Sequence, residues 1–163
     1  MREAADYRKE VLPSSDIDSK FHTHELHTAL LQTSTGKAPG LDGIHAEMIL
    51  NLPPELQEVF LTICNSCWDE GVTPESWLQG LIIPIAKPKK DLRFPKSFRP
   101  ICLLPVLAKL MERLVANRLM NWLNINNKLP DSQYGYRAGR SIDTLLSELT
   151  ARITHGFKTP QNT

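Results

Sequence analysis

The chain has 163 residues, of which 41% are hydrophobic and 23% are charged. This length and composition suit one folded domain and argue against both a disordered chain and a small disulfide-held domain. The net charge of only +1 argues against a polyanionic partner. However, residues 1–80 contain 5 basic and 13 acidic side chains, whereas residues 81–140 contain 12 basic and 3 acidic ones. Because local charge sets the field that a partner feels, the basic region reopens that possibility.

No apolar run approaches the ~20 residues that a membrane-spanning helix needs, and no secretory signal opens the chain. We therefore expect an intracellular protein, nuclear or cytoplasmic, with no membrane partner. The three cysteines, Cys64, Cys67 and Cys102, are too few for a disulfide framework. Because Cys64 and Cys67 lie on the apolar face of a predicted helix, we interpret them as buried thiols rather than zinc or redox groups.

The first half of the chain is predicted to be helical. Residues 1–20 are polar and aperiodic, which indicates a linker or a truncated upstream segment. A short helix capped by Thr23 follows, then a loop at 33–43 and a brief helix at 46–50. The clearest helix begins at Pro54 and ends at Gly71. Its predicted apolar face consists of Leu56, Val59, Phe60, Ile63, Cys64, Cys67 and Trp68.

After a helical turn at 73–77, two short runs rich in β-branched residues, 81–85 and 98–103, predict a hairpin whose internal prolines favour sheet edges. The cations of the hairpin are Lys87, Lys89, Lys90, Arg93, Lys96 and Arg99, against one carboxylate, Asp91. Lysine as a point charge and arginine as a planar fork both suit phosphate. The alternative is a solvated tip whose charges prevent aggregation.

A long helix is predicted from Pro105, with an apolar stripe from Leu107 to Leu123 and with Lys109, Arg113 and Arg118 on its other faces. The elements that would normally cover this stripe are expected to be absent, which would leave an exposed apolar face and a risk of aggregation. A turn at 126–131 precedes a last helix, capped by Ser141 and apolar along its 142–153 face, and a polar tail at 154–163.

Residues 133–140 combine two tyrosines, two arginines and two glycines ahead of the last helix. Aromatic rings can stack on bases, arginines can bind phosphate, and glycines allow close approach of the main chain. The alternative is an ordinary turn whose tyrosines pack on the core.

Several of these segments, in this order, resemble the reverse transcriptase of non-LTR retrotransposons of the jockey and LINE type. The resemblance rests on KAPGLDGI at 37–44, NSCWDEGVTPESW at 65–77, IIPIAKP at 82–88, FRPICLL at 98–104 and QYGYRAGRS at 133–141. Lys109, Glu112 and Arg118 also stand where that family has the same residue types. Together the matching segments cover about residues 21–150.

The resemblance implies an α+β fold that is mostly helical, with a basic two-stranded fingers hairpin. It would be a partial right-hand polymerase domain at 21–153, comprising the fingers and the start of the palm. In this family the residues matching Lys87 and Arg99 bind the triphosphate of the incoming dNTP. The segment carrying Gln133, Tyr136, Arg137 and Arg140 would lie near template and nucleotide. The implied partners are an RNA template, a DNA primer, a dNTP and the missing palm and thumb portion of the polymerase.

The resemblance stops before the family's catalytic carboxylates, which bind two Mg²⁺ ions in the intact enzyme. This chain has no acidic residue after Glu148. We therefore expect no catalytic residue, no metal ligand and no cofactor in this chain, and no DNA polymerisation by the chain alone. Whether it acts as an enzyme stays open at this point. The alternative is a non-enzymatic nucleic-acid-binding or interaction module derived from a retroelement.

Overall fold

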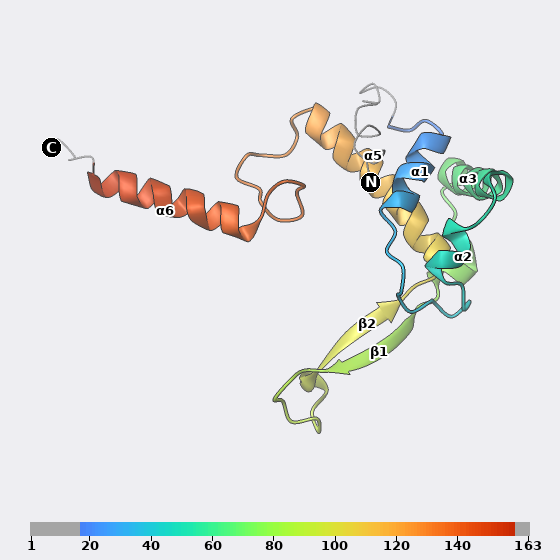
Figure 1. Ribbon diagram of the computed structural model, residues 1–163, viewed down its shortest axis with the longest axis horizontal. Coiled ribbons are helices and arrows are strands. Elements are labelled where there is room, and N and C mark those ends of the chain that lie inside the picture. Colours follow the sequence, from blue (N-terminus) through green and yellow to red (C-terminus); the bar gives the residue numbers. More distant parts are fainter. Residues whose placement is uncertain (1–16, 159–163) are drawn as a thin grey trace. The chain divides into compact units, whose positions relative to one another are not determined.

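The computed structural model describes residues 17–158 (Figure 1). The chain divides into two compact units, Met1–Trp122 and Leu123–Thr163, which we call unit 1 and unit 2. Most of the expected linker at 1–20 and the last residues of the expected polar tail lie outside the described residues. No helix in the described range is long and apolar enough to cross a membrane.

Helices dominate the described residues, and one hairpin interrupts them, as the sequence predicts (Figure 1). In chain order the elements are α1 (Thr23–Leu31), α2 (Ala46–Leu50), α3 (Pro54–Glu70), α4 (Glu75–Leu78), β1 (Leu81–Ala86), a 3₁₀ turn (Pro95–Ser97), β2 (Phe98–Leu103), α5 (Val106–Ile125) and α6 (Ile142–Lys158).

The core of unit 1 forms where α1, α2, α3 and α5 meet. Leu26 of α1, Cys64 of α3, and Leu110 and Leu114 of α5 are all at most 1% exposed. The expectation that the stripe of α5 stays exposed is therefore wrong for its first half, because the helices of the same unit cover it. The prediction that Arg118 lies on another face is also wrong. Arg118 is buried because it follows Leu114 by four residues and shares its face.

The buried face of α3 is narrower than predicted. Phe60 and Cys64 are buried, and the Phe60 ring lies 6.1 Å from the Trp77 ring of α4. Leu56, Val59 and Ile63 are instead more than 40% exposed. Leu61, absent from the predicted stripe, is buried. The apolar face of α3 is thus wider than the part of it that neighbouring elements cover.

The helix ends follow the sequence signals with two exceptions. Gly71 ends α3 in a left-handed conformation, with φ at 66°, as expected of a C-terminal glycine. Thr23 is the first helical residue of α1 rather than its cap. His22 occupies the cap position and donates its N–H to the Glu25 carboxylate at 2.9 Å. Helix α6 continues to Lys158, into the range where the sequence predicts a polar tail.

Strands β1 and β2 pair antiparallel, in a register that sets Pro84 opposite Pro100. Antiparallel ladders alternate hydrogen-bonded and non-hydrogen-bonded pairs. The N–H of Lys87 donates to the Ser97 carbonyl at 2.8 Å, so Lys87 and Ser97 form a hydrogen-bonded pair. Because the two kinds of pair alternate along the strands, the pair of Pro84 and Pro100 is a non-hydrogen-bonded one. Both prolines are therefore accommodated without losing a ladder bond.

Helix α6 carries the apolar face of unit 2. Its predicted cap is confirmed, since the Ser141 hydroxyl accepts the N–H of Thr144 at 3.2 Å. Five apolar residues of the predicted face are exposed by 40% or more: Ile142, Leu145, Leu146, Leu149 and Ile153. This helix therefore differs from α5, whose apolar residues are covered at its N-terminal half.

We expect the three thiols to react with iodoacetamide in the order of their exposure. Cys102 is exposed, Cys67 is half-buried and Cys64 is fully buried. Burial, with a smaller effect of the neighbouring Cys67, raises the pKa of Cys64 to about 12. Its thiolate population at pH 8 therefore falls about a thousandfold relative to an ordinary thiol. Mass spectrometry should show Cys102 labelled first and Cys64 labelled only after unfolding; equal rates would contradict the packing of α3.

Candidate functional site

The hairpin of unit 1 presents Lys87 and Arg99 on the same face. Arg99 pairs with Ile85, and Lys87 lies two residues beyond Ile85. Side chains of directly paired residues, and of residues two apart on one strand, point to the same side of a sheet. Lys87 and Arg99 are thus diagonal neighbours, within reach of one phosphate chain. Arg99 is exposed, and Lys87 donates from Nζ to the Lys96 carbonyl at 2.8 Å.

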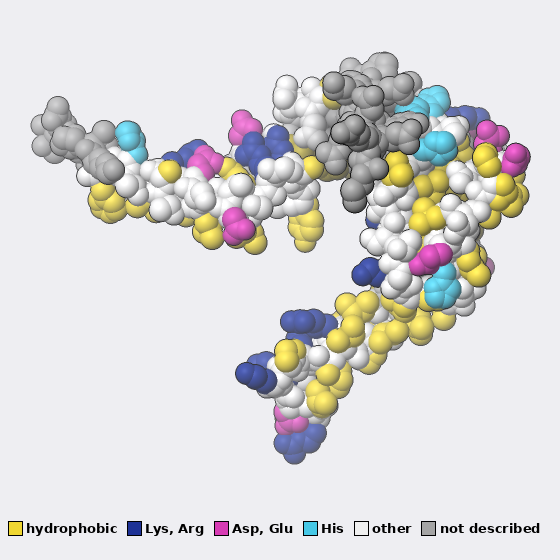
Figure 2. Space-filling view, viewed as in Figure 1, with side chains coloured by type: hydrophobic (Ala, Val, Ile, Leu, Met, Phe, Trp, Pro, Cys, Tyr) yellow, Lys and Arg dark blue, Asp and Glu magenta, His cyan; other side chains and the backbone are white. Residues whose placement is uncertain are grey.

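The cations at the far end of the hairpin do not all have the same surroundings. Figure 2 shows Lys and Arg side chains gathered there. Arg93 forms a two-pronged ion pair with Asp91, at 2.7 Å between Nη2 and Oδ2, and this pair holds the pKa of the Asp91 carboxyl below its usual value. Lys96 lies over the Phe94 ring, 5.4 Å from its centre. The charge of Arg93 is therefore offset locally.

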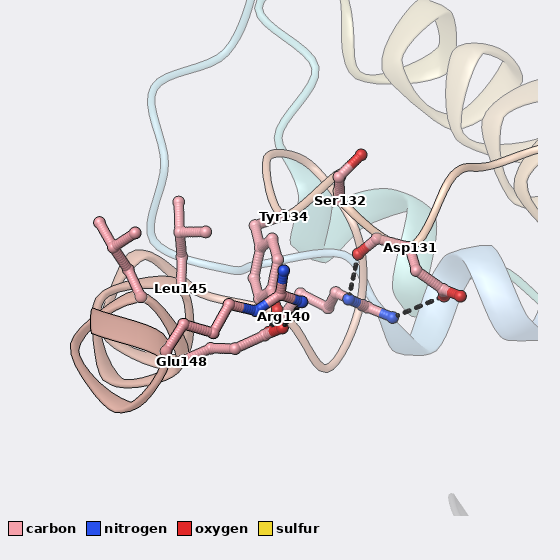
Figure 3. A pocket seen from close by; sticks show the side chains of 8 residues that line it. Asp131, Ser132, Tyr134, Arg140, Leu145 and Glu148 are labelled. Atoms are coloured by element: carbon pink, nitrogen blue, oxygen red, sulfur yellow. Dashed lines mark hydrogen bonds and ion pairs between the residues drawn. The ribbon is translucent and has the colours of Figure 1, made fainter. Parts of the chain in front are cut away.

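The 133–140 segment belongs to unit 2, where Asp131 anchors both of its arginines. Figure 3 shows the contact between Asp131 and Arg140. Arg140 lies 3.1 Å from the Asp131 carboxylate, and Arg137 lies 4.0 Å from it and donates to the Pro130 carbonyl at 3.0 Å. Tyr136 is fully exposed and adopts a positive φ of 56°. Gln133 is exposed as well. Tyr136 is therefore not packed on a core.

Tyr134 lies instead at a pocket of about 410 Å³ between this segment and α6 (Figure 3). Its hydroxyl donates to the Glu148 carboxylate, and the Arg140 guanidinium lies over its ring at 4.9 Å. Arg152 donates to the other oxygen of Glu148 at 2.5 Å. Each positive side chain at this pocket therefore has a carboxylate partner.

The structure brings the expected site residues together as two groups. Lys87 and Arg99 share the hairpin of unit 1, while Gln133, Tyr136, Arg137 and Arg140 share one loop of unit 2.

The loop at 33–43 is fastened to the rest of unit 1 at Gly36 and at Gly40. The Glu47 carboxylate accepts the N–H of Gly36 at 2.5 Å, and this hydrogen bond lowers the pKa of Glu47. A Cβ added to Gly40 would lie only 2.6 Å from the Pro105 nitrogen. Gly40 is therefore in backbone contact with the junction between β2 and α5.

Sequence reasoning missed the role of Arg118, whose guanidinium clamps the chain before α1 onto α5. It binds the Glu25 carboxylate through Nε at 3.0 Å and Nη2 at 2.6 Å. It also donates to the carbonyls of Ile17, Ser19 and Lys20 and lies over the Phe21 ring at 4.2 Å. The available signal was the four-residue spacing of Leu110, Leu114 and Arg118.

The described residues do not fit the Mg²⁺ site that the resemblance implies for an intact enzyme. Within residues 17–158, no three His, Cys, Asp or Glu side chains lie together in a way that could hold a metal ion. The acids closest to the loop of unit 2 are also engaged: Asp131 with two arginines, and Glu148 with Tyr134 and Arg152.

The chain matches a known protein family over part of its length. The family described as reverse transcriptase (RNA-dependent DNA polymerase) matches residues 87–161. The matched range begins at Lys87 and contains Arg99, the loop at 133–140 and α6. It therefore spans both groups of expected site residues.

Among curated proteins, the chain is similar to several from Drosophila melanogaster. It is 35% identical over 133 residues to the probable RNA-directed DNA polymerase from transposon BS, covering 82% of this chain and 15% of that protein. It is 29% identical over 157 residues to the corresponding probable polymerase from transposon X-element, covering 96% and 17%. It is 35% identical over 113 residues to the RNA-directed DNA polymerase from mobile element jockey, covering 69% and 12%. The chain thus spans between 12% and 17% of these relatives.

Proposed function

The chain belongs, as a partial sequence, to the reverse transcriptases of non-LTR retrotransposons, and from this premise we propose that it binds the incoming nucleotide and the template of an RNA-directed DNA polymerase. The observation that carries this proposal is the hairpin register, which makes Lys87 and Arg99 diagonal neighbours on one face. In this proposal the hairpin is the fingers element of a right-hand polymerase.

The chemistry of this pair suits a triphosphate. Arg99 offers a planar fork and Lys87 a compact charge, so the two can contact neighbouring phosphates. Phosphoryl transfer depends mainly on positioning and on neutralising charge, which two cations on a short hairpin supply. The carboxylates near the loop of unit 2 already have partners. We therefore propose that the chain alone holds its substrates without joining them. The parent polymerase would add the Mg²⁺ ions and the palm and thumb.

The loop at 133–140 is proposed to contact the RNA template or the DNA primer. The fully exposed ring of Tyr136 is available for stacking on a base. Arg137 and Arg140 are restrained by Asp131, so their guanidinium groups are ordered before a strand binds. A binding module without enzymatic activity uses the same surfaces, and it differs in having no preference for a nucleoside triphosphate over an oligonucleotide of equal charge.

Replacing Lys87 and Arg99 together by methionine is expected to weaken binding of a fluorescent dATP analogue about a hundredfold. Each charge-assisted hydrogen bond contributes roughly 1.5–3 kcal/mol, which is about tenfold or more in affinity. Fluorescence anisotropy of the labelled nucleotide measures this loss.

The matched control is the double variant Lys89→Met and Lys90→Met, which removes the same charge from the tip of the same hairpin. The control should lose at most a few-fold in affinity. An equal loss in both double variants would show that only the overall field attracts the nucleotide, and the assignment to Lys87 and Arg99 would then be wrong.

A further inference from the structure

A second group of cations lies at the base of the hairpin, around a pocket of about 240 Å³ in unit 1. Lys37 of the 33–43 loop lines one side, and Lys109 and Arg113 of α5 line another. The hydroxyl-bearing residues Thr33 and Ser34 complete the polar part of the wall. The pocket is thus built within one unit from the 33–43 loop, Ala46 of α2 and the first half of α5.

The lining contains three cations and no carboxylate, unlike the pocket of unit 2. Lys109 and Arg113 are four residues apart, so their like charges lie one above the other on α5 and repel each other by a few tenths of a kcal/mol. An anion between them relieves this repulsion. Lys, Arg and hydroxyl groups are also the donors that proteins use to bind phosphate.

The walls of this pocket are held in place by contacts outside it. Arg113 donates through one Nη to the Gln32 carbonyl, which orients the guanidinium and leaves its other N–H groups for a ligand. The loop is fastened by Glu47 at Gly36 and by the backbone contact of Gly40. The Glu47 carboxylate accepts the N–H of Gly36 through one of its two oxygens, and the other oxygen has no hydrogen-bond partner among the described residues. A ligand therefore meets a largely preformed site.

The position of the pocket points to a strand rather than a nucleotide. Strand β2 ends at Leu103 and α5 begins at Val106, whose side chain lines the pocket. Arg99 lies four residues before the end of β2, about 13 Å along the strand. Figure 2 shows Lys and Arg side chains both at the far end of the hairpin and close to its base. One triphosphate cannot fill both places, whereas a strand with repeated phosphates can.

We propose that this pocket binds a phosphate group of the nucleic-acid strand, separately from the nucleotide held by Lys87 and Arg99. The proposal rests on the proposed function for the identity of the ligand, but its evidence is the composition and position of the pocket. A phosphodiester of single-stranded RNA or DNA and free inorganic phosphate share the required chemistry, and the experiment separates them.

The first test measures protection of lysines from acetylation in the full chain, read by mass spectrometry. Lys37 and Lys109 should be protected by a micromolar ten-nucleotide RNA without a terminal phosphate, whereas inorganic phosphate should need millimolar concentration. Protection by inorganic phosphate without protection by the RNA would overturn the strand assignment. Protection by neither would overturn the phosphate site itself.

The second test is the double variant Lys109→Met and Arg113→Met. Its affinity for the same RNA should fall about tenfold, and the slope of log K against log salt should decrease by about 1 to 2. The control Lys20→Met and Arg93→Met removes two cations that are each paired with a carboxylate, and it should leave the slope nearly unchanged. Equal slopes in the two double variants would contradict the proposal.

Measuring the affinity for the dATP analogue as well distinguishes the pocket from the proposed nucleotide site on the hairpin. The variant Lys109→Met and Arg113→Met should bind the nucleotide as the unmodified chain does, which also shows that unit 1 is folded. If the hairpin variant kept its nucleotide affinity while the pocket variant lost RNA affinity, the proposed nucleotide site would fail and the phosphate pocket would stand.

Discussion

Replacing Arg118 by methionine is expected to lower the free energy of unfolding of unit 1 by about 3–5 kcal/mol. The guanidinium is buried, with 2% of its side chain exposed, and the Glu25 side chain that it contacts is 11% exposed. Removing Arg118 leaves that carboxylate with little water and without its cation. It also leaves the carbonyls of Ile17, Ser19 and Lys20 without this donor.

The conservative replacement Arg118→Lys should lose much of the same stability. Lysine keeps the charge, but it has a single ammonium group in place of the planar fork that reaches Glu25 and three carbonyls at once. We expect about 2–3 kcal/mol for this variant, because the remaining ammonium satisfies only part of the acceptor set. If stability rises from Arg118→Met to Arg118→Lys and again to the unmodified chain, the planar guanidinium stabilises the fold in addition to its charge.

Urea denaturation followed by tryptophan fluorescence measures these effects, since Trp68, Trp77 and Trp122 all belong to unit 1. The matched control is Arg113→Met, on the same helix. The side chain of Arg113 makes one hydrogen bond to a backbone carbonyl and no ion pair among the described residues. That variant should cost about 1 kcal/mol or less. If Arg118→Met were as stable as Arg113→Met, the clamp would not stabilise the fold.

Replacing Gly40 by alanine should lower the free energy of unfolding of unit 1 by about 3 kcal/mol. The added Cβ would lie 2.6 Å from the Pro105 nitrogen and 2.8 Å from the Leu104 carbonyl carbon. Both atoms are backbone, and they join the hairpin to the first turn of α5. No rotation of a side chain relieves the overlap, so the loop must move away from the start of α5.

Gly80→Ala provides the matched control for this prediction. A Cβ at Gly80 would also meet a close neighbour, but that neighbour is the sulfur of the exposed Cys102 side chain, which can rotate away. We expect a loss of about 1 kcal/mol or less there. The same denaturation experiment compares the two variants, and a similar loss in both would mean that the loop is not seated against the backbone at Pro105.

Gly40→Ala also bears on the phosphate pocket, because the 33–43 loop supplies Lys37. If the substitution shifts this loop, acetylation of Lys37 should become insensitive to the RNA even at temperatures where unit 1 stays folded. Lys109, on α5, should retain part of its protection. The two lysines therefore report separately on the two walls of the pocket.

The hairpin shows how much of the structure can be predicted from local sequence pattern. Two β-branched runs separated by a basic stretch predict β1 and β2, and the prolines inside both runs predict edge positions. The observed register agrees, because Pro84 and Pro100 oppose each other where no ladder bond is needed. The family resemblance was likewise readable, since it rests on ordered short segments and not on long-range packing.

Burial was less predictable, and α3 and α5 show the reason. Periodicity says which residues of a helix share a face, but not how much of that face a neighbour covers. Leu56 and Ile63 of α3 carry the expected spacing and are exposed, whereas Arg118 of α5 is charged and is buried. The cost of burying Arg118 is offset by Glu25 and by carbonyls that precede α1, and these partners are more than ninety residues away in the sequence.

The sequence by itself determined the family, the order of helices and hairpin, and the separation of an acidic first half from a basic region. These properties depend on residue type and on spacing along the chain, so no packing is needed to read them. Only the tertiary structure decided which cations act together. Lys37 lines one pocket with Lys109 and Arg113, Arg93 forms an ion pair with Asp91, and Arg118 is buried against Glu25. The reason is that electrostatic interaction depends on distance and burial in space, and folding sets both.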